Sequence, residues 1–247
     1  MARIITCGFE AQSASEWAGT EGTAPTFSTG VRNSGTASVR FQNTTSSARS
    51  IRFQVYADDT VGSGKNVYIR AYIRLDAAPA ARTAILAWDD ATGVGTGSFY
   101  CIKVNPDCTL IATASGGTSG AASSALTLGA WYRLEMNYDG AAHTLTPYLN
   151  GSAWATAISA DLGGGHWARF GVINPTTLDL YFDDIAVNDA SGGSPDNGLP
   201  GAVPASQVSG HVKAWSGSAW TFNPVKVWNG TTWTTKPLKR WSGSTWL

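Results

Sequence analysis

The stretch VYIRAYIRL, residues 67–75, decides the fold class because apolar and polar side chains alternate along it without a break. Successive side chains of a strand point to opposite faces of the sheet. The five odd-numbered positions are therefore apolar on one face, whereas Tyr68, Arg70, Tyr72 and Arg74 share the other. The sequence predicts a β-strand here, with one face packed on a core and one polar face.

Shorter runs of the same kind flank this stretch on both sides. They recur roughly every ten to fifteen residues and are separated by turn-forming segments, as in a β-sandwich. Gly accounts for 28 of 247 residues and charged residues for only 14%, a composition that suits strands and turns better than helices. We therefore expect an all-β protein, with strands near 3–10, 37–41, 50–55, 83–88, 99–104, 108–114, 131–138, 144–149, 166–173 and 179–187.

The three cysteines are expected to be buried free thiols. Asn105 to Asp107 resembles a hairpin turn, and pairing Val104 with Thr109 would place Cys101 opposite Ala112 instead of Cys108. This register argues against a disulfide between these two cysteines, and each thiol is expected to serve as a small apolar residue.

A 13-residue repeat occupies the end of the chain, from His211 to Leu247. Its shared pattern is Val or Leu, Lys, any residue, Trp, Ser or Asn, Gly, Ser or Thr, any residue, Trp. Each unit predicts a β-hairpin in which two indoles face each other across a four-residue turn. Isolated hairpins are marginal in water, and six indoles in so short a segment need a surface to pack on. We interpret the repeat as an assembly device acting through Trp215, Trp220, Trp228, Trp233, Trp241 and Trp246; the alternative is an indole-rich patch on the chain's own domain.

The chain divides into three segments by composition. A sandwich is expected over 1–190, a Gly/Ser/Pro linker over 191–211, and three Trp hairpins over 212–247. Five of the 17 basic residues and none of the 17 acidic ones fall in 211–247, which leaves 12 basic against 17 acidic residues in the remainder. Zero net charge predicts no general attraction to nucleic acid. The start, MARIITCGFE, has no apolar core of a signal peptide, and no run is long enough to span a membrane.

Residues for catalysis are sparse. Glycosidases built on β-sandwiches can carry the motif Glu-x-Asp-x-x-Glu, which is absent from this sequence. The nearest pair of acids is Glu135 and Asp139, and Asp139 followed by Gly140 is better interpreted as a turn. We therefore interpret the protein as not an enzyme. No cofactor is expected, although Asp89 and Asp183 are weak candidates for Ca²⁺ ligands and a closed metal site is not predicted.

Sugar recognition uses aromatic faces, and two tryptophans of the sandwich are candidates for it. Trp154 follows Asn150-Gly151, a turn, and Trp88 precedes Asp89-Asp90. Most tryptophans of a sandwich pack in the core or at its edges, so core packing is the alternative for both.

Several segments, taken in order, resemble the laminin-G-like, or concanavalin A-like, jelly roll. The resemblance covers about 1–190 and implies two antiparallel sheets packed face to face. The segments that carry it are Gly8-Phe9-Glu10 with Trp17, Phe99–Val104 followed by Asp107–Leu110, Trp131–Glu135, Leu145–Gly151 and Phe182–Val187.

The Trp-Asn-Gly-Thr-Thr-Trp tail behind such a jelly roll resembles virion proteins of tailed phages that infect actinobacteria, often of the minor tail type. That resemblance covers 212–247 and implies a non-enzymatic structural protein located in the virion. Its partners would be itself, as a homotrimer, other virion proteins and a host cell-surface glycan, with neither nucleic acid nor membrane. A capsid decoration protein, a carbohydrate-binding lectin and, last, a polysaccharide-degrading enzyme are the alternatives.

Overall fold

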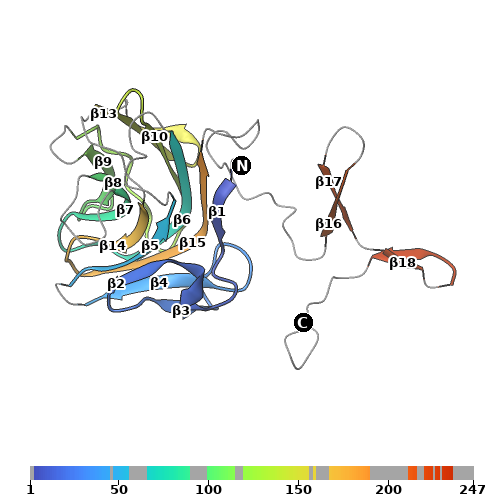
Figure 1. Ribbon diagram of the computed structural model, residues 1–247. Helices are drawn as coiled ribbons and strands as arrows, with labels where there is room; N and C mark the ends of the chain where they lie inside the picture. The colour runs from blue at the N-terminus through green and yellow to red at the C-terminus, as the bar shows by residue number, and fades with distance from the viewer. Residues whose placement is uncertain are drawn as a thin grey trace. The chain divides into compact units, whose positions relative to one another are not determined.

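The computed structural model describes residues 3–44, 47–55, 66–89, 99–114, 119–155, 158–159, 167–189, 211–215, 220–224, 226–228 and 230–235. The chain divides into two compact units, Met1–Ala202 and Val203–Leu247. The first unit is a β-sandwich of two antiparallel sheets, and Figure 1 shows its two layers, with β6 and β15 in one and β7 to β9 in the other.

Sheet A has nine strands. Its main order is β12-β11-β10-β6-β15-β4-β3, with β1 paired to the end of β15 and β13 paired to β11. The strands are β1 (Arg3–Cys7), β3 (Thr26–Ser28), β4 (Ser38–Asn43), β6 (Val67–Ala77), β10 (Trp131–Asp139), β11 (Thr144–Leu149), β12 (Ser152–Ala153), β13 (Ile158–Ser159) and β15 (Leu178–Asp189).

Sheet B has six strands in the order β2-β5-β14-β7-β8-β9. A short 3₁₀ helix, η1 (Ala14–Glu16), precedes its first strand and is capped by Ser13. The strands are β2 (Gly19–Gly22), β5 (Arg49–Gln54), β7 (Thr83–Asp89), β8 (Phe99–Val104), β9 (Leu110–Ala114) and β14 (Trp167–Val172).

The core lies between the sheets and confirms the alternation of residues 67–75. All five apolar positions of that stretch are buried in one hydrophobic cluster. Four phenylalanines bridge the layers: the ring of Phe182 in sheet A lies 5.6 Å from that of Phe170 in sheet B, and each has a second edge-on partner, Phe41 and Phe53 respectively. The all-β sandwich predicted from the sequence is therefore the observed fold.

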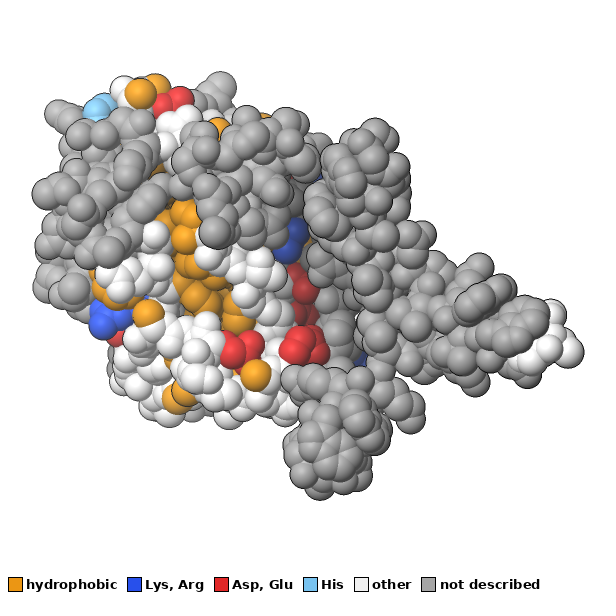
Figure 2. All heavy atoms as spheres, turned by 45° about the vertical axis from the view of Figure 1, so that its right-hand side comes forward, with side chains coloured by type: hydrophobic (Ala, Val, Ile, Leu, Met, Phe, Trp, Pro, Cys, Tyr) orange, Lys and Arg blue, Asp and Glu red, His pale blue; other side chains and the backbone are white. Residues whose placement is uncertain are grey.

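The surface of this unit is largely polar. Among the described residues, Leu128 is the only large hydrophobic side chain that is exposed. In the view of Figure 2, orange hydrophobic side chains reach the surface mainly as a narrow stripe, with acidic side chains beside it. The described part of the chain holds no helix of the length and apolar character needed to cross a membrane.

The β8–β9 hairpin differs by one residue from the expected register. Val104 pairs with Leu110 instead of Thr109, and Cys101 pairs with Thr113 instead of Ala112. The turn takes up an extra residue because Cys108 adopts a left-handed conformation, φ 62°, where glycine is usual. The prediction of three buried free thiols is nevertheless confirmed, since Cys7, Cys101 and Cys108 are all buried and free.

The second unit contains two described hairpins, each forming its own two-stranded sheet. One pairs β16 (His211–Trp215) with β17 (Trp220–Pro224), and the other pairs β18 (Lys226–Trp228) with β19 (Trp233–Thr235). The opposition of paired tryptophans predicted from the repeat is confirmed, since Trp215 lies opposite Trp220 and Trp228 opposite Trp233. The third repeat, with Trp241 and Trp246, lies outside the described residues, as does the predicted linker apart from His211.

Candidate functional site

The outer face of sheet B, which points away from the core, carries an unusual set of side chains. Along β14, Ala168 and Phe170 face the core, so Trp167 and Arg169 lie on the outer face. The register between strands extends this assignment across the sheet. The outer face of sheet B thus includes Glu21, Ser50, Arg52, Gln54, Ala87, Asp89, Cys101, Lys103, Thr113, Trp167 and Arg169.

Arg169 is at the centre of this face and is completely buried. Its Nη1 lies 3.0 Å from Oε2 of Glu21 and its Nη2 lies 3.0 Å from Oδ2 of Asp89. The side chain of Arg169 is 0% exposed, that of Glu21 12% and that of Asp89 5%. Three charges are therefore held out of water on the sheet face that points away from the main hydrophobic core, and the burial of charge carries a large desolvation cost.

Hydrogen bonds fix the glutamate within this arrangement. The Ser50 hydroxyl donates to Oε2 of Glu21 at 2.9 Å, the same oxygen that Arg169 contacts. The other oxygen, Oε1, is buried and has no hydrogen-bond partner among the described residues. One carboxylate oxygen thus retains unused accepting capacity at the edge of the ion-pair cluster.

A glycine permits the close strand approach beside this cluster. Gly171 of β14 has φ 132°, and a Cβ at this position would lie 2.4 Å from the carbonyl oxygen of Arg49 and 2.8 Å from the Cα of Ser50. Only glycine fits there, because both atoms belong to the backbone of β5.

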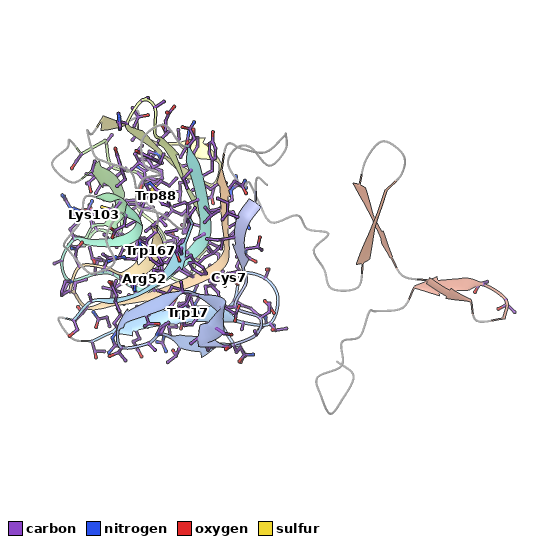
Figure 3. The ribbon with its side chains drawn as sticks, viewed as in Figure 1. Cys7, Trp17, Arg52, Trp88, Lys103 and Trp167 are labelled. Carbon is purple, nitrogen blue, oxygen red and sulfur yellow. The ribbon has the colours of Figure 1, made fainter. Side chains whose placement is uncertain are left out.

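Arg52 and Trp167 form a second pair on the same face, next to Arg169. The Cζ atom of Arg52 lies 4.7 Å from the centre of the Trp167 ring, a cation–π contact (Figure 3). Arg52 lies opposite Arg169 in the β5–β14 register, and Gln54 lies opposite Trp167. Gln54 is exposed, Arg52 is half-buried and Trp167 is 9% exposed, so Gln54 and Arg52 are the solvent-accessible residues of this corner.

The cysteine on this face is not a nucleophile. Sγ of Cys101 lies 3.0 Å from Oγ1 of Thr113, and burial raises the pKa of the Cys101 thiol to about 11. The thiol is therefore protonated at neutral pH, and thiolates rather than thiols attack electrophiles.

The two tryptophans predicted as sugar contacts lie elsewhere. Trp88 is on the inner face of β7, 1% exposed, with its ring 6.4 Å from that of Tyr138. The prediction that Trp88 contacts a sugar is therefore wrong, because its ring packs in the core and does not reach the surface. Trp154 follows β12 and is half-buried against the core, so its role stays a prediction.

The acidic candidates are also dispersed. Glu135 is buried and paired with Arg133, Nε to Oε2 at 2.9 Å, whereas Oδ1 of Asp139 accepts the N–H groups of Ala141 and Ala142 and closes a turn, as expected. Four strand residues separate these acids by roughly 13 Å, too far for the paired carboxylates of a retaining glycosidase.

The two weak calcium candidates lie in different sheets. Asp89 pairs with Arg169 in sheet B, and Asp183 lies in β15 of sheet A. Oδ2 of Asp183 accepts the backbone N–H groups of Asn33 and Ser34, and burial, together with the neighbouring Asp184, raises its pKa to about 7. Among the described residues no group of three or more His, Cys, Asp or Glu is placed to hold a metal ion.

Apart from Asp89, a weak calcium candidate, and Cys101, expected to be a buried thiol, the residues of the outer face of sheet B were not singled out from the sequence. The available signal was the alternation Trp167-Ala168-Arg169-Phe170, which places a tryptophan and an arginine on one face of the strand and two core residues on the other. The partners of Arg169 come from β2 and β7, so strand order was needed to assemble the cluster.

No protein-family model matches the sequence, and a search of the curated proteins gave no match. Similar folds are found among solved structures. A cellulose-induced protein, Cip1, is 19% identical with a TM-score of 0.56, over 74% of this chain and 96% of that one. A carbohydrate esterase of the Shiga toxin-encoding bacteriophage phi24B is 15% identical with a TM-score of 0.55, over 75% and 97%.

A third similar structure is botulinum neurotoxin type C, whose cell entry depends on interaction with two ganglioside molecules. It is 10% identical with a TM-score of 0.54, over 76% of this chain and 47% of that one. At these identities the likeness establishes the β-sandwich fold.

The interpretation that the protein is not an enzyme is corrected by these comparisons. The phage carbohydrate esterase has a similar fold, and the match covers 97% of the esterase chain. The inference from the sequence considered the carboxylate spacing of glycosidases, and that spacing does not apply to other carbohydrate chemistry.

Proposed function

We propose that the first unit is a carbohydrate-binding domain and that the sugar binds at the corner of the outer face of sheet B formed by Arg52, Gln54 and Trp167. The observation that carries this proposal is the Arg52–Trp167 stack, which lies against the buried Glu21–Arg169–Asp89 cluster. Sugar sites combine an aromatic surface with a few fixed polar groups.

The buried cluster gives this corner its rigidity. Arg169 is fixed by two carboxylates and lies opposite Arg52 in the register, so the strands that carry the contact residues are held by interior ion pairs. Binding groups held in place by such a supporting layer lose little entropy when a ligand arrives. The proteins of similar fold also support carbohydrate as the ligand, since they include a carbohydrate esterase, a cellulose-induced protein and a toxin that interacts with gangliosides.

A carbohydrate-modifying enzyme is the second candidate function. It is favoured by Oε1 of Glu21, a buried carboxylate oxygen without a hydrogen-bond partner among the described residues. A carboxylate in such a position can accept a proton from a sugar hydroxyl or a water molecule. Under this hypothesis Glu21→Gln abolishes the formation of product from a polysaccharide. Its affinity for the same polymer stays within about twofold of that of the unmodified protein, as expected for a group needed only in the transition state.

The setting we propose is a phage particle. The Trp repeat, its resemblance to phage minor tail proteins and the fold shared with a phage protein support a virion component whose hairpins anchor it, as a homotrimer or against other virion proteins. A capsid decoration protein is the alternative location. Immunogold labelling of intact particles would separate tail from head, and labelling of neither would refute the proposal.

Binding itself is tested on the full chain with a panel of soluble glycans: cello-oligosaccharides, chito-oligosaccharides, sialyllactose and host cell-wall polysaccharide. Gln54→Ala is the informative variant, because an exposed side chain can be truncated without loss of the fold. We expect Gln54→Ala and Arg52→Ala to weaken the best ligand by roughly tenfold, the effect of losing one or two hydrogen bonds. Trp154→Ala tests the position that the sequence predicts as a sugar contact, and a loss of binding in this variant alone would place the site there.

A further inference from the structure

The first hairpin of the second unit separates its residue types between two faces. Trp215 lies opposite Trp220, and Lys213 lies opposite Phe222. Opposed residues, and those two apart along a strand, share a face of a hairpin. One face of this hairpin therefore carries two tryptophans, a phenylalanine and a lysine. The aliphatic Val212 falls on the other face.

The second hairpin repeats this arrangement. Trp228 lies opposite Trp233, and Lys226, two residues before the first tryptophan, lies opposite Thr235. Val227 again falls on the other face. Two tandem hairpins thus place the same pair of tryptophans and the same lysine at equivalent register positions, 13 residues apart.

The charge of the segment that contains these hairpins favours anionic partners. Residues 211–247 contain five basic residues and no acidic ones. A surface of one sign selects partners of the opposite sign and draws them in over distances of about 10 Å at moderate salt.

We infer that the hairpin unit is a second binding element, for a polysaccharide with a negative charge on its repeating sugars. Indole faces stack on sugar rings, and a lysine two residues away can bind a carboxylate or phosphate substituent. A binding face repeated at a fixed spacing suits a ligand that is itself repetitive, because several weak identical contacts then act together.

An anionic lipid surface is less compatible with this placement. Interfacial membrane segments place tryptophan, phenylalanine and leucine on the inserted face and lysine on the opposite, polar face. Here Lys213 and Lys226 fall on the same face as the tryptophans. The assembly role proposed above would use the tryptophan face, and the experiment therefore has to separate polymer binding from self-association.

The test uses the full chain with polygalacturonate, which has a carboxylate on every sugar, and with its methyl-esterified, uncharged form. We expect tighter binding to polygalacturonate than to the esterified polymer. The variant that combines Lys213→Gln and Lys226→Gln with Lys239→Gln, the corresponding lysine of the third repeat, should bind polygalacturonate about tenfold or more weakly, with little change for the esterified polymer. Arg82→Gln, a basic residue exposed on the first unit, is the matched control and should bind as the unmodified protein does.

Two further measurements make the outcome specific to the hairpins. Polygalacturonate binding should persist when Gln54→Ala and Arg52→Ala remove the proposed site of the sandwich, and it should be lost in Trp228→Thr with Trp233→Thr. Equal affinity for both polymers, or no effect of the triple lysine variant, would overturn the inference. Binding to phosphatidylglycerol vesicles but not to polygalacturonate would also overturn it. A protein that binds neither polymer, and whose lysine or tryptophan variants lose only self-association, would overturn it as well.

Discussion

Replacing Arg169 with methionine should destabilise the protein far more than an equivalent change at the surface. The methionine retains much of the side-chain volume but removes the cation that contacts two carboxylates, each 3.0 Å from the guanidinium. With an effective dielectric constant near 20, each pair at 3–4 Å contributes about 4–5 kcal/mol of Coulomb energy, and part of this offsets desolvation. Removing one partner of a buried pair costs about 3–5 kcal/mol, which is the loss we expect in the free energy of unfolding.

The assay is urea unfolding of the full chain at pH 7, followed by tryptophan fluorescence. Arg74→Met is the matched control, because the Arg74–Asp76 pair is even closer, at 2.6 Å, but its side chains are 25% and 26% exposed, and such a pair contributes less than about 1 kcal/mol. Adding Glu21→Gln and Asp89→Asn to Arg169→Met should restore at least half of the loss. Equal losses for the two arginine variants, or no rescue, would refute the reasoning about the buried cluster.

Three other perturbations follow from the fold. Because burial raises the pKa of Asp183 to about 7 from 3.8, its contribution to stability is fully present below pH 4 and is lost as the pH rises through 7. The free energy of unfolding should therefore fall between pH 4 and pH 8, by on the order of 4 kcal/mol at most. Asp183→Asn should remove most of this pH dependence in unfolding curves measured over the same range. Gly171→Ala should lower the melting temperature by more than Gly30→Ala, since a Cβ at 171 meets two backbone atoms of β5 and one at 30 meets nothing. Phe170→Ala should cost about 3–5 kcal/mol in the same assay, because its ring joins the two sheets.

The fold was predictable because its signal is local. The alternation over 67–75 predicts which side chains of β6 face the core, and the Trp-x-Gly-x-x-Trp spacing predicts the opposition of Trp228 and Trp233. In both cases the residues that decide the structure lie within one strand or one turn.

The candidate site was not predictable in the same way. Every residue of β7 is buried, so the strand shows no alternation between buried and exposed positions, and Trp88 could not be assigned to the core from its neighbours. Arg169 meets Glu21 and Asp89, which are 148 and 80 residues distant in the sequence, only because β2, β5, β14 and β7 lie in that order. The register of the β8–β9 turn was missed because Cys108 takes a backbone conformation that its residue type rarely adopts.

The most direct test of the central claim is hydrogen–deuterium exchange of the full chain with and without the glycan that binds most tightly in the panel. If the corner formed by Arg52, Gln54 and Trp167 holds the sugar, amide protection should increase in β5 and β14 and stay unchanged in the strands of sheet A. Protection confined to sheet A or to residues 211–235, or none at saturating glycan, would contradict a carbohydrate site on the outer face of sheet B.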